Sequence, residues 1–163
     1  MKGVQQLSRR TISAIRMGDF AVSANDGVLR SLLGSCIGLA LYDHTHKVGG
    51  LAHIVLPQSR GPGGPAGKFV DTAIPALYAE METLAGRSLK PTARIAGGAN
   101  LFSTTVIQTI GTQNIEATER LLCELKIPLL GRHCGGEKGR RMSLDTATGV
   151  ITIEIVGSDP IEL

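Results

Sequence analysis

The stretch that decides the fold reads Leu32-Leu33-Gly34-Ser35-Cys36-Ile37-Gly38-Leu39-Ala40-Leu41-Tyr42-Asp43, and a second run, Val48-Gly49-Gly50-Leu51-Ala52-His53-Ile54-Val55-Leu56, follows it closely. Each run is mostly aliphatic and is bounded by polar or turn-forming residues, which is typical of a buried strand. The polar segment between them, residues 43–47, is short enough for a hairpin turn. We therefore predict two antiparallel neighbours that carry a thiol and an imidazole on one small piece of sheet.

Cys36 and His53 are a candidate nucleophile and base. Cys36 directly follows Gly34 and Ser35, a pair whose backbone can turn sharply and expose a thiol. Backbone N–H groups at such a corner can converge on an oxyanion. An imidazole inside an aliphatic strand costs free energy unless it has a polar partner. The residues alone leave two interpretations open: a catalytic dyad, or a small buried cysteine beside a core histidine that bonds to a backbone carbonyl.

Composition narrows the class of protein. The chain has 163 residues, 42% hydrophobic and 19% charged, as expected for one soluble domain with its own core. It has no Trp, two Tyr and three Phe, and its net charge is only +3 with Lys and Arg dispersed. Scarce aromatic residues and the lack of a basic face argue against nucleic-acid binding.

Further features of the chain concern its location. No run approaches the roughly 18 apolar residues of a membrane span, and the N-terminus lacks the apolar core of a signal peptide. Three cysteines, an odd number without metal-ligand spacing, argue against a disulfide framework and a metal centre. We therefore expect a cytoplasmic protein without membrane insertion and without a metal or other cofactor.

The rest of the chain reads as strands and two helices. We predict an N-terminal extension over residues 1–16 with a short strand near 11–15, and one domain over residues 17–163. Apolar periodicity predicts helices at 69–85, closed by Gly86, and at 114–126, with Asn114 as N-cap. Further strands are predicted at 19–23, 92–96, 129–134, 140–144 and 150–156. The sum is an α+β layered structure. The Pro- and Gly-rich loop 57–67 is either the rim of a site or a plain connector.

Several blocks of the sequence, in order, closely resemble the CheD family of chemoreceptor glutamine deamidases. The blocks are residues 33–37, 50–57, 69–77, 97–102, 110–117, 135–141 and 145–149. The resemblance implies a single-domain, three-layer α-β-β sandwich, similar to bacterial toxin domains that deamidate glutamine. It also implies hydrolysis of receptor glutamines to glutamate and ammonia through a thioester on the cysteine.

The resemblance further implies a Cys-His pair completed by a hydroxyl residue, usually threonine, just upstream of the cysteine. Cys36 and His53 match the pair, but no threonine precedes Cys36 at that distance. Ser31 is the hydroxyl residue nearest to the position of that threonine, and its side chain offers the same donor and acceptor. Arg30 is the alternative residue for that position. Gly34 and Ser35 are the expected source of backbone N–H groups for the oxyanion.

The partners implied are the cytoplasmic helical regions of methyl-accepting chemoreceptors and, in some bacteria, a CheC-type phosphatase. Arg140 and Arg141 are candidates for docking an acidic receptor surface. Two alternatives remain. The first is a non-catalytic module that binds receptors or CheC phosphatase, favoured by the missing threonine. The second is a thiol hydrolase or transglutaminase that acts on another amide.

Overall fold

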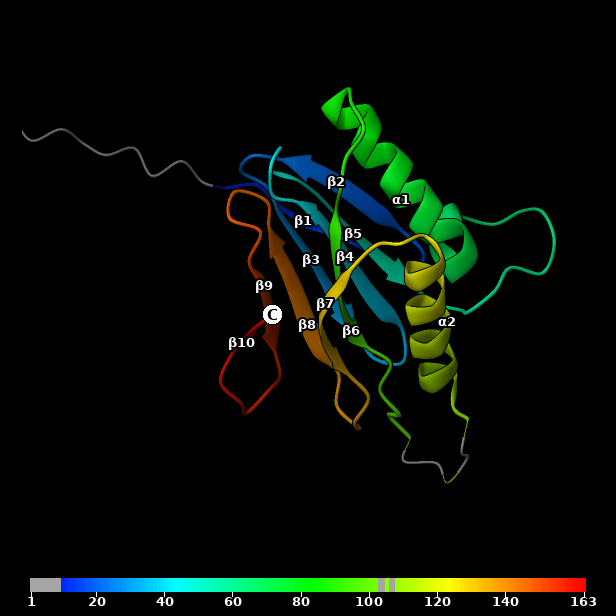
Figure 1. The fold of residues 1–163 in the computed structure, drawn as a ribbon. Coiled ribbons are helices and arrows are strands. Elements are labelled where there is room, and N and C mark those ends of the chain that lie inside the picture. The colour runs from blue at the N-terminus through cyan, green and yellow to red at the C-terminus, as the bar shows by residue number, and fades with distance from the viewer. Residues whose placement is uncertain (1–9, 103–104, 106–107) are drawn as a thin grey trace, which may run out of the picture.

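The predicted hairpin forms the centre of a sheet in the computed structural model, which describes residues 10–102, 105 and 108–163 (Figure 1). Strands β4 (Ile37–Asp43) and β5 (Val48–Ile54) pair antiparallel, from Ile37 opposite Ile54 to Asp43 opposite Val48. Every residue of both strands is buried. A strand without polar alternation is expected where both faces of a sheet are covered, and both faces are covered here.

Two mixed five-stranded sheets contain the strands of the described residues. The hairpin sheet has the order β2 (Phe20–Ala24), β5, β4, β6 (Thr92–Gly97) and β7 (Leu129–Cys134). The outer sheet has the order β1 (Ile12–Ala14), β3 (Val28–Leu33), β8 (Arg140–Asp145), β9 (Ile151–Glu154) and β10 (Ile161–Glu162). Each sheet contains one parallel pair, β6 with β7 and β1 with β3, among antiparallel neighbours.

The two α helices of the described residues lie on one side of the hairpin sheet. Helices α1 (Val70–Ala85) and α2 (Ile110–Glu124), with a short 3-10 helix η1 (Ala66–Lys68) before α1, cover one face of that sheet, and the outer sheet covers the other (Figure 1). Two apolar cores result: Ile37, Leu39 and Leu41 face the helices, whereas Ala40, Tyr42 and Leu51 face the outer sheet. The predicted α+β class is confirmed, and the layers follow the order helix, sheet, sheet.

The ends of the two helices differ in how well they were predicted. Gly86 closes α1 in the left-handed conformation, with φ of 64°, as expected of a C-terminal glycine. Helix α2 begins at Ile110, earlier than predicted, and Thr109 caps it by accepting from the N–H of Thr112. The prediction that Asn114 caps this helix is therefore wrong. Because the helix begins at Ile110, Asn114 lies in its second turn rather than at its end. The Asn114 side chain is fully buried there.

The N-terminal stretch takes part in the fold from residue 12 onward. β1 pairs with β3, and the buried Ile15 accepts a hydrogen bond from Ser31 Oγ and donates its N–H to the Arg30 carbonyl. Residues 12–15 thus pack with the sheets although they lie in the stretch predicted as an extension. Residues 1–9 lie outside the described part of the chain.

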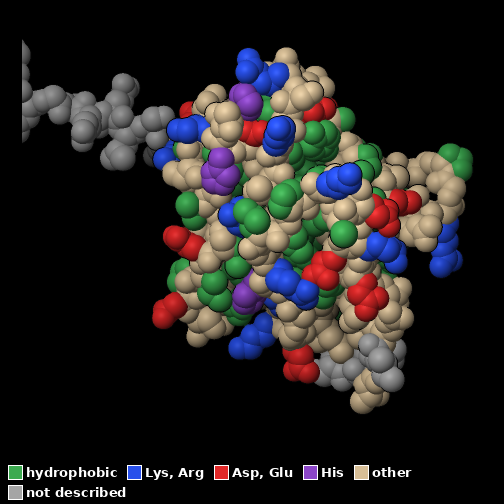
Figure 2. Space-filling model, viewed as in Figure 1, with side chains coloured by type: hydrophobic (Ala, Val, Ile, Leu, Met, Phe, Trp, Pro, Cys, Tyr) green, Lys and Arg blue, Asp and Glu red, His purple; other side chains and the backbone are tan. Residues whose placement is uncertain are grey.

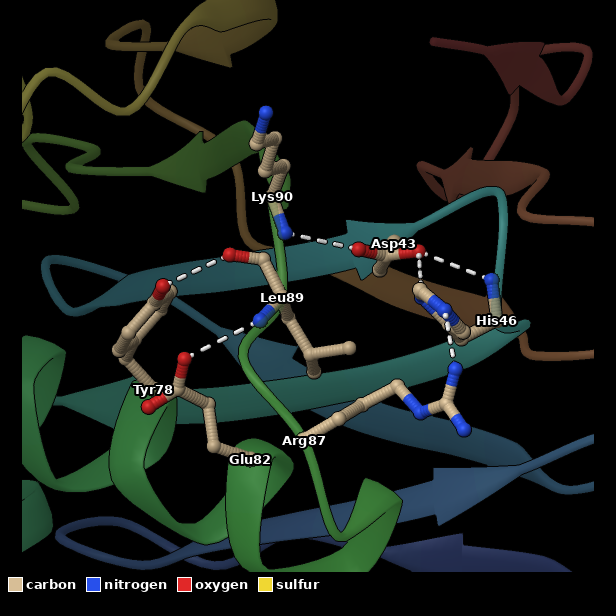
Figure 3. Close-up of polar contacts among 7 residues, drawn as sticks. All are labelled: Asp43, His46, Tyr78, Glu82, Arg87, Leu89 and Lys90. Carbon is tan, nitrogen blue, oxygen red and sulfur yellow. Dashed lines mark hydrogen bonds and ion pairs between the residues drawn. The ribbon is translucent and has the colours of Figure 1, made fainter.

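The turn at the far end of the hairpin is fixed by Asp43 (Figure 3). Its carboxylate accepts from the N–H groups of His46 and Lys90, at 2.9 and 2.8 Å, and His46 Nδ1 lies 3.1 Å away. Burial acts to raise the pKa of Asp43, but these hydrogen bonds outweigh it, so the pKa lies below its ordinary value. The His46 ring also contacts Arg87 after α1. This histidine thus has structural partners.

The face of the molecule drawn in Figure 2 shows no concentration of one charge. Figure 2 shows Lys and Arg interspersed with Asp and Glu over the face in view. Within the described residues, no helix has the length and hydropathy needed to span a membrane. The loop over residues 57–67 projects past α1 (Figure 1) and is anchored near its ends, since Ser59 and Ala66 bond to side chains at the start of that helix.

Candidate functional site

The pairing of β4 with β5 brings Cys36 and His53 to the same end of the hairpin sheet. His53 is opposite Gly38, and Cys36 lies in the bend directly before Ile37, which is paired with Ile54. The contact with Ser31 shows that the His53 side chain faces the outer sheet. Gly38 itself has no room for a side chain, because a Cβ there would lie 2.6 Å from Leu33 Cδ1. Both candidate residues are nearly covered, with 7% of Cys36 and 4% of His53 exposed.

Ser31, on β3 of the outer sheet, bonds directly to the imidazole. Its Oγ lies 2.7 Å from His53 Nδ1 and 2.8 Å from the carbonyl oxygen of Ile15. A carbonyl only accepts, so the hydroxyl donates to Ile15 and accepts from the Nδ1–H of His53. This assignment puts the imidazole lone pair on Nε2. That atom is buried and has no hydrogen-bond partner among the described residues.

Arg30, the other occupant considered for this position, points away from the site. Neighbouring residues of a strand face opposite sides of the sheet, and Arg30 Nε donates to Ser143 Oγ on β8 at 3.1 Å. Of the two alternatives, Ser31 is the one that contacts His53. The signal for it lies in the sequence: Leu29 and Leu33 alternate with Arg30, which places Ser31 on the buried face of β3.

The corner over residues 34–36 is held by its carbonyl groups. The Gly34 carbonyl accepts from Ala99 N–H, and the Cys36 carbonyl accepts from Gly98 N–H, both at 2.9 Å. Gly97 lies against this corner with φ of +107°, and a Cβ there would be 2.1 Å from the Cys36 oxygen. The last residue of β6 must therefore be glycine for the strand to approach the corner so closely. Among the described residues, no loop hydrogen bond uses the N–H of Cys36.

Burial keeps the Cys36 thiol and the His53 imidazole uncharged. Burial raises the pKa of the Cys36 thiol above its ordinary value. Burial also lowers the pKa of His53 below 6.5, with the Ile15 carbonyl opposing the shift in part. Both shifts favour the neutral form of the group. At neutral pH the resting pair is therefore a thiol and an imidazole rather than a thiolate and an imidazolium.

The two candidate docking arginines have different surroundings. Arg140 is buried, with 4% exposed, and its guanidinium donates to the carbonyl oxygens of His133 and Lys138 at 2.6 and 3.2 Å. Burial lowers the pKa of Arg140. Arg141 is exposed and forms a bidentate pair with Glu154 at 2.8 and 2.9 Å. Arg140 thus fixes the loop before β8, and Arg141 is the one that presents its charge to solvent.

Asn114 belongs to the same end of the fold and was not predicted there. Its Nδ2 donates to the carbonyl of Ser35, next to Cys36. The sequence pattern instead predicted Asn114 as the cap of a helix over residues 114–126. Gly111 is required inside α2, since a Cβ there would lie 2.5 Å from the Gly98 oxygen. Within the described residues, no group of three or more His, Cys, Asp or Glu side chains is arranged for a metal ion.

A family model described as CheD chemotactic sensory transduction matches residues 55–155. The match covers more than half of the chain and begins after Cys36 and His53. It therefore rests on the later strands and both helices, and not on the thiol and the imidazole.

Curated relatives match nearly the whole chain. A protein of Clostridium botulinum strain Hall, named "Probable chemoreceptor glutamine deamidase CheD", is 43% identical over 154 residues, which is 90% of this chain and 95% of the relative. A protein of the same name from strain Eklund 17B is 41% identical over 148 residues, covering 87% of this chain and 91% of the relative. A match over 90% of the chain spans positions 36 and 53.

Proposed function

The chain belongs to the CheD family, and from this premise we propose that it is a chemoreceptor glutamine deamidase. The reaction is hydrolysis of the side-chain amide of receptor glutamines to glutamate and ammonia. One structural observation supports the catalytic part of the proposal independently of the family match. Ser31 accepts from His53 Nδ1, so the free lone pair lies on Nε2 of an imidazole at the same end of the hairpin sheet as Cys36.

The first half of the reaction forms a thioester. His53 Nε2 takes the proton of Cys36 Sγ as the sulfur attacks the carboxamide carbon of the substrate glutamine. The positive charge that develops on the imidazole is stabilised by the hydrogen bond from Nδ1–H to Ser31. Negative charge develops on the amide oxygen, and the backbone N–H groups of the corner over residues 34–36 are its donors. The imidazolium then gives its proton to the leaving ammonia.

The second half hydrolyses the thioester. The neutral imidazole accepts a proton from a water molecule, whose oxygen attacks the acyl carbon. The C–S bond breaks, and the proton on His53 returns to the sulfur, which leaves a substrate glutamate. The cycle uses one water and releases one ammonia. It requires the histidine in its neutral form at the start of both halves, in keeping with the lowered pKa of His53.

The partners proposed are methyl-accepting chemoreceptors in the cytoplasm, with a CheC-type phosphatase as a further candidate. The likeness to glutamine-deamidating toxin domains is part of the same proposal. Arg141 is the proposed docking residue, because it is exposed and its guanidinium pairs with one carboxylate already. An acidic receptor surface would compete for that guanidinium. Arg140 is left out of this role because its guanidinium is bonded to the protein backbone.

The decisive experiment measures ammonia release and the accompanying mass gain of about one dalton per converted glutamine, from a purified receptor cytoplasmic fragment. Wild type is compared with Cys36→Ala and His53→Ala, and Cys123→Ala is the matched control because Cys123 is exposed on α2. The proposal expects activity in wild type and in the control only. Binding without ammonia release from several receptors would favour a non-catalytic binding module. Incorporation of a labelled primary amine in excess of hydrolysis would favour a transglutaminase.

A further inference from the structure

Asn114 is fully buried inside α2, at 0% exposed, and its carboxamide reaches the ends of two strands. Its Nδ2 lies 3.2 Å from the carbonyl oxygen of Ser35 and 2.9 Å from that of Val55. Both partners are acceptors, so both hydrogens of Nδ2 are used and the carboxamide has one orientation. Oδ1 then faces the other way, buried and without a partner among the described residues.

A buried acceptor without a partner, such as Asn114 Oδ1, lowers the stability of the fold. The asparagine is therefore not explained by stability alone, and its distinguishing feature is the pair of donors on Nδ2. A carboxamide is the smallest neutral side chain with two donors on one atom. Serine and threonine have one donor, and an aspartate has none. The arrangement is therefore specific to the pair of carbonyls at Ser35 and Val55 rather than a general filling of the core.

The two carbonyls flank the place where the β4–β5 ladder stops. The last pair is Ile37 with Ile54, so the next positions outward are Cys36 and Val55. Among the described residues, the pairing of these two segments ends there, and Asn114 bridges them from the helix layer. The spacing between the corner that carries Cys36 and the strand that carries His53 thus depends on this side chain.

Asn114 also fixes the orientation of one peptide group. The Ser35 carbonyl and the Cys36 N–H belong to the same planar trans peptide and point in opposite directions. The hydrogen bond from Asn114 therefore directs the Cys36 N–H away from α2 and polarises it. Donors that are oriented before the reaction are what stabilises a developing oxyanion.

We propose that Asn114 is a positioning residue: it orients the Ser35–Cys36 peptide and holds the Cys36 corner against the end of the His53 strand. It acts through Cys36 and does not touch the substrate. The assignment of a reaction to this corner rests on the proposed function, whereas the geometry of the bridge does not.

The test replaces Asn114 by leucine, which has similar size and no donors. Thr118→Val is the matched control: Thr118 is equally buried, lies one turn further along α2, and loses a single hydrogen bond, to the Asn114 carbonyl at 2.8 Å. Asn114→Ser serves if the leucine variant does not fold. We expect kcat on a receptor fragment to fall about 10- to 100-fold in Asn114→Leu, with KM changed by less than about twofold. Thr118→Val should keep its kcat, and equal losses in both variants would overturn the proposal.

A second measurement needs no receptor. The rate of Cys36 alkylation by iodoacetamide, resolved by peptide mass spectrometry, is compared in wild-type and His53→Ala backgrounds. If Asn114 positions the thiol for the imidazole, Asn114→Leu slows alkylation in the wild-type background and has no further effect without His53. Equal slowing in both backgrounds would overturn positioning. A wild type that releases no ammonia would refute the proposed function, and this cycle would still decide the role of Asn114.

Discussion

Ser31→Ala separates the role of Ser31 in the reaction from its role in stability. The hydroxyl accepts from His53 Nδ1–H and donates to the Ile15 carbonyl, and 3% of Ser31 is exposed. Alanine therefore leaves two buried polar groups without a partner, at about 1 to 3 kcal/mol each. We expect a loss of about 2 to 6 kcal/mol in the free energy of unfolding, against a total stability of about 5 to 15 kcal/mol for a typical domain.

Ser31→Ala should lower turnover as well as stability. Without the acceptor on Ser31, the Nδ1–H tautomer loses its preference, and the other tautomer has no lone pair at Nε2 to take the thiol proton. We expect kcat for ammonia release to fall about 10²- to 10³-fold, with KM nearly unchanged because Ser31 is buried.

Two further variants sharpen the Ser31 experiment. Ser31→Thr keeps the hydroxyl and should retain most of the activity. Ser143→Ala removes a hydroxyl from the same sheet, one that accepts from Arg30, and should leave kcat unchanged. A folded Ser31→Ala protein with kcat within about threefold of wild type would refute the reasoning, because tautomer control is worth far more than that.

Three other predictions follow from the same geometry. The pH profile of kcat/KM should have its acid limb below pH 6.5, because burial lowers the pKa of His53. The free energy of unfolding should also decline as the pH falls from 6.5 toward the lowered pKa of His53, since the fold favours the neutral imidazole. Gly97→Ala should abolish activity and destabilise the fold, because the new Cβ meets the Cys36 carbonyl, whereas Gly86→Ala, at a positive φ with open space, should cost only about 1 kcal/mol and leave kcat unchanged. Arg141→Gln should raise KM for the receptor fragment at low salt and lose that effect at high salt, and an unchanged KM at low salt would exclude Arg141 from docking.

The sequence predicted those features that short stretches of chain determine. The hairpin of β4 and β5 was confirmed because two aliphatic runs with a polar segment between them have few other solutions. The start of α2 was missed because Asn114 reads as its cap, whereas the helix begins at Ile110 and its first turn lies in close contact with the Gly98 carbonyl, at Gly111. Asn114 was missed with it, since its partners at Ser35 and Val55 are distant in the chain.

Arg140 shows that local sequence also fails to predict whether a charged side chain is buried. Beside Arg141 it reads as a surface pair, and only the loop that folds back from β7 supplies the carbonyl oxygens that bury its guanidinium. Burial of a charged group is decided by such partners and not by local pattern.

Each layer of the fold contributes at least one polar residue to the candidate site. The hairpin sheet and the corner before β4 carry His53 and Cys36, the outer sheet supplies Ser31, and the helix layer supplies Asn114. Burial between packed layers further disfavours the thiolate and the imidazolium. The same burial strengthens every hydrogen bond that orients the pair. Correct packing of all three layers is thus a condition for the tautomer of His53 and for the orientation of the Cys36 peptide.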